Sequence, residues 1–126
     1  MKKIILYTCL LITASLGLLT FIVLSDEKNI LAIESYNNPE SAYKLGHIYL
    51  KEGDNDNARK WFEIAINDGV SEAGAVLYFL YTDPRNSFHN IYKAEDYMKW
   101  AMNDTPEDVK EEIRNELKSF GIEPSF

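Results

Sequence analysis

The stretch DNDN, residues 54–57, comes closer than any other part of the sequence to the residue types of a metal site. Alternating carboxylate and amide oxygens are typical of a calcium-binding loop. If Asp54 is the first position of such a loop, however, Arg59 stands at the sixth, which needs glycine. Ala65 then stands at the twelfth, which needs a bidentate glutamate. The stretch is therefore interpreted as the cap of a helix.

Catalytic chemistry finds little support in the residue types and their spacing. His47 and His89 are far apart, and no histidine or cysteine pair has the spacing of metal ligands. The sequence also lacks a glycine-rich phosphate loop and the Gly-x-Ser-x-Gly motif of a serine hydrolase. We therefore expect a protein that is not an enzyme and that uses no cofactor and no metal. Its function should reside in a surface.

The charge of the chain bears on what that surface can bind. The sequence has 13 basic and 20 acidic side chains, a net charge of −7, with no block of lysines or arginines. Attraction to the phosphates of a nucleic acid is therefore disfavoured. Residues 1–25 contain two lysines and no acid, so the remainder carries a net charge of −9. A protein partner with a basic surface fits this charge better.

Residues 4–24 form an uncharged apolar run that follows Lys2 and Lys3 and ends just before Asp26. A helix needs roughly 20 apolar residues to cross a bilayer, whereas the apolar part of a cleaved signal peptide has about 7–15. Residues 1–25 are therefore expected to be an uncleaved signal anchor in the inner membrane of a bacterial envelope, with the remaining chain in the periplasm. Cleavage near Ser25, which would release a periplasmic protein, remains the alternative.

Beyond the apolar run, turn residues divide the chain into helix-sized pieces. Asn38 followed by a proline is a typical helix start, as is Thr105-Pro106. Glycines suit the helix ends at positions 53, 69 and 121. No alternation typical of a strand persists after residue 26. The expected helices span residues 39–52, a stretch capped by Asp54 or Asn55 that runs to about 67, 71–82, 91–103 and 106–119. A lead-in segment, 26–38, precedes them, in which 27–36 can form a short helix.

A pattern of small and aromatic residues occurs twice in this helical region. Four positions recur after 36 residues, so that Ala58, Trp61, Phe62 and Ala65 correspond to Ala94, Tyr97, Met98 and Ala101. Two positions of the preceding helix recur after 32 residues, so that Leu45 and Tyr49 correspond to Leu77 and Tyr81. Spacings of three and four place each set on one face of a helix. The repetition predicts two helical hairpins within residues 39–103, the second with a longer loop.

These residues, together with several glycines and alanines, resemble the Sel1-like repeat, a relative of the tetratricopeptide repeat. The positions that match are Leu45, Gly46, Tyr49, Gly53, Ala58, Trp61, Phe62, Ala65, Gly69, Ala73, Leu77, Tyr81, Lys93, Ala94, Tyr97 and Ala101. The chain departs from the pattern at Ser41, Ile66 and Tyr78, where small residues are expected. The resemblance implies an all-α fold, a short α-solenoid of two hairpins, and a role in protein–protein interaction.

The repeated positions are interpreted as structural. Gly46, Ala58 and Ala65 allow the two helices of a hairpin to approach closely, while the larger side chains fill the space between them. Two hairpins alone leave apolar faces uncovered, so a cap is needed. Residues 104–126 are expected to supply it, since the helix at 106–119 is apolar on one side: Val109, Ile113, Leu117 and Phe120.

Candidate partner-binding residues follow from the face that such repeats use. The resemblance implies that the first helices of the hairpins line a concave face, which would hold Tyr43, His47, Leu50, Ala75, Phe79 and Thr82. Alternatively, Leu50 and Phe79 are core residues beneath the lead-in or capping segment. Trp100 lies outside the repeated positions and either packs under the capping helix or serves as an exposed anchor.

Two functions remain after these exclusions. The first is an exported or membrane-tethered adaptor that recruits another protein, as the resemblance implies. The second is an immunity or inhibitor protein against a toxin delivered by neighbouring bacteria, which suits a small, exported and acidic chain. A toxin gene directly upstream would favour the second.

Overall fold

The computed structural model describes residues 26–103 and 105–123, and all of the regular structure in these ranges is helical. The predicted all-α class is therefore confirmed. The predicted hydrophobic helix at residues 1–25 lies outside the described ranges. Among the described helices, none has the length and apolar character that a membrane crossing needs. The helices are α2 (Glu27–Glu34), α3 (Pro39–Lys51), α4 (Asn55–Asn67), α5 (Ala73–Thr82), α6 (Ile91–Met102) and α7 (Glu107–Ser119).

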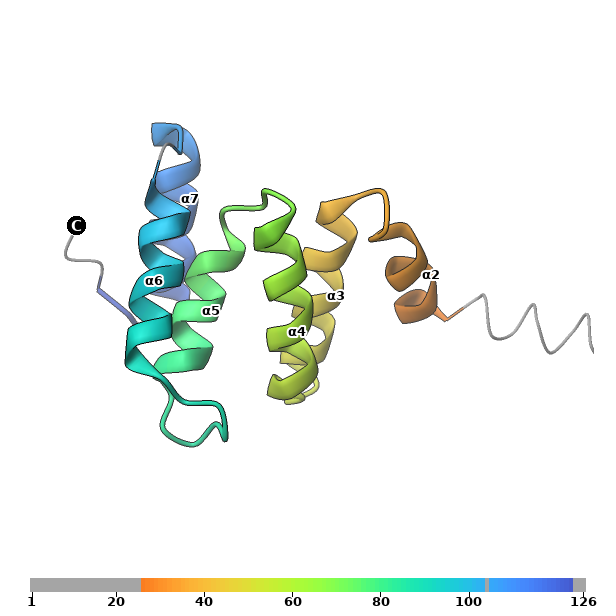
Figure 1. Ribbon diagram of the computed structural model, residues 1–126, viewed down its shortest axis with the longest axis horizontal. Coiled ribbons are helices and arrows are strands. Elements are labelled where there is room, and N and C mark those ends of the chain that lie inside the picture. The colour runs from red at the N-terminus through yellow and green to blue at the C-terminus, as the bar shows by residue number, and fades with distance from the viewer. Residues whose placement is uncertain (1–25, 104, 124–126) are drawn as a thin grey trace, which may run out of the picture.

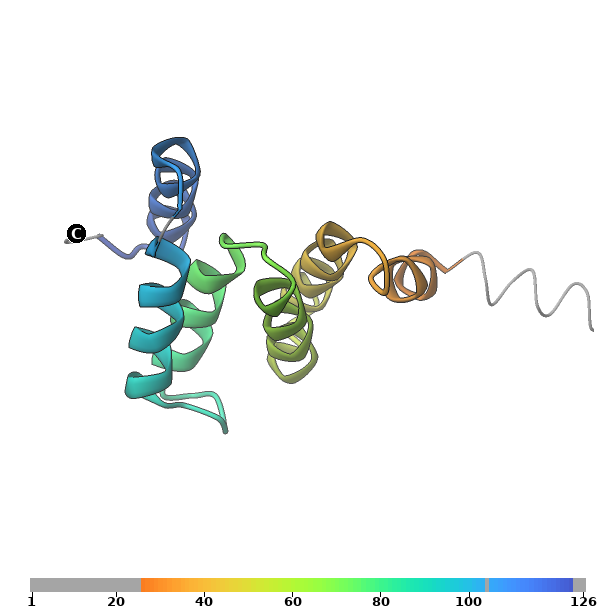
Figure 2. The same cartoon turned by 45° about the horizontal axis from the view of Figure 1, so that its top comes forward.

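The helices follow one another along the molecule in nearly the order of the chain, as Figure 1 shows. Helix α2 lies at one end, and α6 and α7 lie at the other; the turned view in Figure 2 keeps this order. Helix α3 packs on α2 and on α4, α5 packs on α4 and on α6, and α7 packs on α5. The chain thus forms two helical pairs, α3 with α4 and α5 with α6.

Side chains at the helix starts explain where most helices begin. The side chains of Asn38, Asp54 and Asn90 each accept a hydrogen bond from a backbone N–H in the first turn of α3, α4 and α6. Such bonds satisfy donors that have no partner inside the helix. The Asp54 carboxylate accepts bonds from both the backbone N–H and the side-chain amide of Asn57. The DNDN stretch is therefore a helix cap, as the sequence indicated.

Two helices begin later than predicted. Helix α5 starts at Ala73 rather than at residue 71, because residues 70–72 form turns whose carbonyls accept the first N–H groups of the helix. Helix α7 starts at Glu107, because Pro106 has an extended backbone with ψ of 151°. The Thr105 hydroxyl does not cap α7 but donates to the carbonyl of Ala101 at 2.8 Å.

Close packing within the helical pairs depends on two glycines. A Cβ atom at Gly46 of α3 would lie 2.8 Å from the ring of Phe62 in α4. A Cβ atom at Gly74 of α5 would lie 2.4 Å from the Cβ of Ala101 in α6. The sequence predicted the first contact but not the second. The second contact nevertheless had a signal in the sequence. Gly74 lies 32 positions after Ala42, which is the same spacing that separates the repeated leucines, and Ala42 is also a fully buried small residue.

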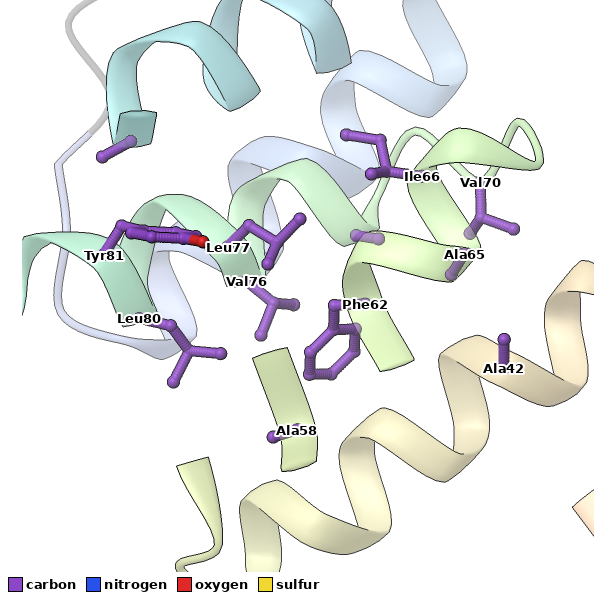
Figure 3. Close-up of a cluster of buried hydrophobic side chains, with 12 residues drawn as sticks. Ala42, Ala58, Phe62, Ala65, Ile66, Val70, Val76, Leu77, Leu80 and Tyr81 are labelled. Carbon is purple, nitrogen blue, oxygen red and sulfur yellow. The ribbon is translucent and has the colours of Figure 1, made fainter. Parts of the chain in front are cut away.

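The core extends through both pairs and into α7. Figure 3 shows Phe62 of α4 beside Val76 of α5, within a buried cluster that also includes Ala42 of α3 and Leu80 of α5. A second cluster joins α5 and α6 to Ile113 and Leu117 of α7. Three of the repeated large residues, Tyr49, Trp61 and Tyr97, are only partly buried against the first cluster. Helix α7 buries the apolar side that the sequence indicated.

Candidate functional site

Two of the predicted partner-binding residues belong to the first helical pair and pack within it. Tyr43 and His47 of α3 pack edge to face, with ring centroids 4.6 Å apart. Both rings also contact Phe62, at centroid distances of 5.6 Å and 5.0 Å. Their side chains are partly buried, and burial raises the pKa of Tyr43 and lowers the pKa of His47. These aromatic side chains therefore support the helix contact and leave limited area for a partner.

Helix α7 reaches the same side of α3. The Nε2 atom of His47 lies 3.7 Å from a carboxylate oxygen of Glu116. Burial raises the pKa of Glu116, while burial followed by the charge of Lys51 lowers the pKa of His47. Burial thus favours the neutral form of both partners, although an ion pair would favour the charged forms. Because 3.7 Å is longer than a hydrogen bond, the ion pair is weak and burial determines the direction of both pKa shifts.

In the second helical pair, the capping segment covers much of the face expected to be open. The ring of Phe79 stacks on Phe120, just after α7, with centroids 4.3 Å apart. Ala75 is fully buried in the cluster with Ile113 and Leu117, so its expected place on an open face is wrong. The Thr82 hydroxyl donates to the carbonyl of Phe79 at 3.0 Å. Phe79 is thus packed beneath the capping segment, which agrees with the interpretation of this residue as part of the core.

Leu50, the remaining predicted residue of α3, is partly buried against the first cluster. The predicted set therefore does not form one continuous open surface in the described part of the chain. Its members are brought near one another by α7 but are largely used for packing. Whether they also contact a partner stays a prediction.

Trp100 has the opposite environment. Its side chain is 51% exposed on α6, so the interpretation that it packs under the capping helix is wrong and the exposed alternative is correct. Helical geometry places Tyr92, which is 81% exposed, on the same side of α6, together with the exposed Asp96 and Lys99. We call these four residues the α6 outer face. It lies opposite the buried side of α6, which holds Ala94, Met98 and Ala101.

The outward position of Trp100 had a signal in the sequence. Ile64 occupies the corresponding position of α4, 36 residues earlier, and is also exposed, at 39%. Ile64 directly precedes the buried Ala65, and Trp100 directly precedes the buried Ala101. The offset of 36 residues therefore relates exposed positions of α4 and α6 as well as buried ones.

A polar cluster at the junction of α4, α5 and α6 was not predicted. A carboxylate oxygen of Glu63 accepts hydrogen bonds from the hydroxyls of Tyr81 at 2.5 Å and Tyr97 at 3.2 Å. Arg59, one turn earlier in α4, donates to both oxygens of the same carboxylate and lies over the ring of Phe88. The spacing of Arg59 and Glu63 by four residues could have indicated their pairing. Because the donors come from α4, α5 and α6, the cluster joins the two helical pairs.

A metal site is not formed in the part of the chain that the structure describes. No group of three histidine, cysteine, aspartate or glutamate side chains there could hold a metal ion. The α6 outer face is thus the candidate site that combines large exposed aromatic side chains with charges. Comparisons of the chain with family models, with curated proteins and with solved structures found no match.

Proposed function

We propose that this chain is an exported or membrane-tethered protein–protein interaction module, an adaptor that binds a partner through the α6 outer face. In this proposal the two helical pairs are the hairpins of a short α-solenoid of the Sel1-like type, and α7 is its cap. The packing of each helix on the next from α2 to α6, and of α7 on α5, supports the arrangement. So does the close approach of the helices within each pair, at Gly46 in the first pair and at Gly74 in the second.

The exposure of Trp100 is the observation that carries the proposed binding surface. Tryptophan and tyrosine are enriched among the residues that dominate binding energy, because they bury a large area with few rotatable bonds. The half-exposed Trp100 and the almost fully exposed Tyr92, on the same side of α6, leave apolar area that is available to a partner. Neither side chain is needed to fill the core.

The surrounding charges indicate the kind of partner. Glu95 and Asp96 are exposed on α6 next to the two aromatic residues, and the chain beyond residue 25 carries a net charge of −9. Acidic groups around an apolar centre attract a basic protein surface and chiefly raise the association rate. Raising the salt concentration should therefore slow association more than it speeds dissociation.

The proposal is tested with the full chain, solubilised in mild detergent and used as bait in membrane extract. A captured partner is purified, and its binding kinetics are measured against the parent, Trp100→Ala and Ile64→Ala. Loss of an anchor residue costs about 2 kcal/mol or more, so Trp100→Ala should weaken binding about thirtyfold, mainly through faster dissociation. Ile64→Ala is the matched control at the corresponding exposed position of α4 and should bind like the parent.

Equal binding by the parent and Trp100→Ala would reject the α6 outer face. If Tyr43→Ala, with its fold intact, lost binding instead, the partner would use the side of α3. A captured enzyme that loses its activity in the complex would make the chain an inhibitor and not an adaptor.

A further inference from the structure

A second group of exposed apolar side chains lies at the opposite end of the molecule. Ile30 and Ile33 of α2 are 40% and 61% exposed, and Tyr36, just after the helix, is 91% exposed. The spacing of three residues keeps the two isoleucines near one side of α2, and Tyr36 follows in the turn at its end. We call these three residues the α2 outer face. In Figure 1 this end of the molecule is where the described chain begins.

The opposite side of α2 is fixed to α3 and to the turn that follows it. Lys28 forms an ion pair with Glu52, and its Nζ atom lies 4.6 Å from the centroid of the Tyr49 ring. Leu31 is buried, and one turn further on the Glu34 carboxylate accepts a hydrogen bond from the Ser41 hydroxyl at 3.2 Å. These contacts set the rotation of α2. The two isoleucines therefore stay turned outward and cannot be buried by a rotation of the helix.

The sequence places this face close to the end of the apolar run. Only Ser25 and Asp26 separate residues 4–24 from the first residue of α2. Two residues span at most about 7 Å, even when fully extended. The headgroup region on each side of a bilayer is about 5–7 Å thick, given the difference between the total and the hydrocarbon thickness. If the run crosses a bilayer, α2 therefore begins within the headgroup region or at its edge.

We propose that the α2 outer face docks on the surface of the same bilayer that residues 4–24 cross. This inference rests on the membrane tether in the proposed function. The occupant is the boundary between lipid headgroups and acyl chains, into which an amphipathic helix buries its apolar side. Tyrosine is enriched at this depth. The anchor makes the contact intramolecular, so even a weak affinity of so short a helix is sufficient.

The charges near the face limit the type of lipid. The Asp26 carboxylate accepts a hydrogen bond from the backbone N–H of Lys28, and both Asp26 and Glu27 are exposed. An acid near the surface disfavours a strongly anionic membrane. A zwitterionic surface therefore suits the α2 outer face best. Docking through α2 would also direct α6, at the other end of the molecule in Figures 1 and 2, away from the membrane and toward a partner.

The test uses the full chain in phosphatidylcholine nanodiscs, at less than one chain per disc so that a second copy is absent. Cys9→Ser removes the single cysteine of the sequence. A fluorescent probe is then attached through Tyr36→Cys or, as a control at the far end, through Glu95→Cys. Quenching by lipids that carry a nitroxide near the headgroup reports contact with the bilayer. Retention on membranes after a carbonate wash reports the tether independently.

We expect the probe at position 36 to be quenched strongly and the probe at position 95 to be quenched little. Adding Ile30→Ser and Ile33→Ser should reduce quenching at position 36 to the level of position 95, with membrane retention unchanged. Ile64→Ser is the matched control, because Ile64 is as exposed as Ile30 but lies on α4, and it should leave quenching unchanged. Circular dichroism checks that each variant keeps its helical content.

Three results would overturn the docking while leaving the tether intact, because the chain would still be retained on membranes. The first is weak quenching at position 36. The second is strong quenching that persists in the double serine variant, which would mean proximity without docking. The third is an emission shifted to the blue without quenching by the nitroxide lipid, which would mean that protein covers the face. Loss of membrane retention in the parent would reject the tether, and the docking with it.

Discussion

Phe62 is fully buried, and its neighbour Trp61 is not. Phe62 has no exposed area and contacts the rings of Tyr43 and His47, while Trp61 is only partly buried. The loss of a large buried side chain removes its transfer energy and leaves a cavity. We therefore expect Phe62→Ala to reduce the free energy of unfolding by about 3–5 kcal/mol, and Trp61→Ala to reduce it by less. Urea unfolding of the full chain in mild detergent measures both, and a larger loss for Trp61→Ala would contradict the packing described.

Gly74 is the glycine whose replacement should be most costly. An added Cβ would meet the Cβ of Ala101 at 2.4 Å and the backbone oxygen of Tyr97 at 2.9 Å, and neither atom belongs to a side chain that can swing away. Gly74→Ala gains about 1 kcal/mol of helix propensity but forces α5 and α6 apart. Overpacking costs about 1–3 kcal/mol, so we expect a net loss of up to about 2 kcal/mol after this gain.

Gly46→Ala is the comparison for this prediction. Its new Cβ would meet only the ring of Phe62, at 2.8 Å, so part of the overlap can be relieved by a shift of that ring. Its loss of stability, measured by the same unfolding experiment, should be the smaller of the two. A Gly74→Ala variant as stable as the parent would show that the α5 to α6 contact can loosen without cost.

At the scale of helices, Glu63 connects three elements through one carboxylate. The Tyr81 hydroxyl donates from α5 at 2.5 Å and the Tyr97 hydroxyl from α6 at 3.2 Å. A hydrogen bond to a charged group contributes about 1.5–3 kcal/mol. Tyr81→Phe should therefore reduce stability by an amount in this range, and Tyr97→Phe by less because its bond is longer. Equal stability of the parent and Tyr81→Phe would mean that Arg59 and Tyr97 satisfy the carboxylate without the Tyr81 hydroxyl.

The contact between α3 and α7 should depend on pH through His47. Burial lowers the pKa of His47, so the histidine contributes stability that is present above its unfolded pKa of about 6.5 and is lost as pH falls through the lower folded value. Glu116 acts in the opposite sense, since its pKa is raised and its contribution is lost as pH rises through that value. We expect the stability of the parent to fall between pH 7 and 5 by more than that of His47→Gln. Parallel pH profiles of the two proteins would contradict this.

Helices were the most predictable feature, because local signals determine them. Asn38 and Asp54 cap helices where the sequence indicated, and Ile113 and Leu117 are buried on the predicted side of α7. The position of α7 against α5, with Glu116 near α3, was not predictable, since periodicity gives the apolar side of a helix but not its crossing angle. The contacts of Phe79 with Phe120 and of His47 with Glu116 depend on that angle. The candidate site was predicted only in Trp100, because the residue type and spacing of Tyr92 do not distinguish it from the tyrosines that pack in the core.

For the molecule as a whole, α5 decides whether the two helical pairs behave as one unit. Its residues belong to both core clusters, and Tyr78 packs against each of them. Arrays of helical repeats unfold together when the contacts between neighbouring units are strong and separately when these contacts are weak. The Glu63 cluster adds a polar connection across the same junction. We therefore expect the pairs to unfold in a single transition.

The chain contains one tryptophan in each helical pair, which allows this expectation to be tested directly. Trp61 lies in α4 and Trp100 in α6, and these are the two tryptophans of the sequence. In Trp100→Phe the fluorescence reports on the first pair, and in Trp61→Phe on the second. Each fluorescence transition in urea should have the same midpoint as the loss of helical circular dichroism in the same variant, because a two-state chain gives coincident transitions for all probes. A fluorescence midpoint that clearly precedes the loss of helix in either variant would show that α5 does not couple the pairs, and that the α6 outer face can unfold while the first pair stays folded.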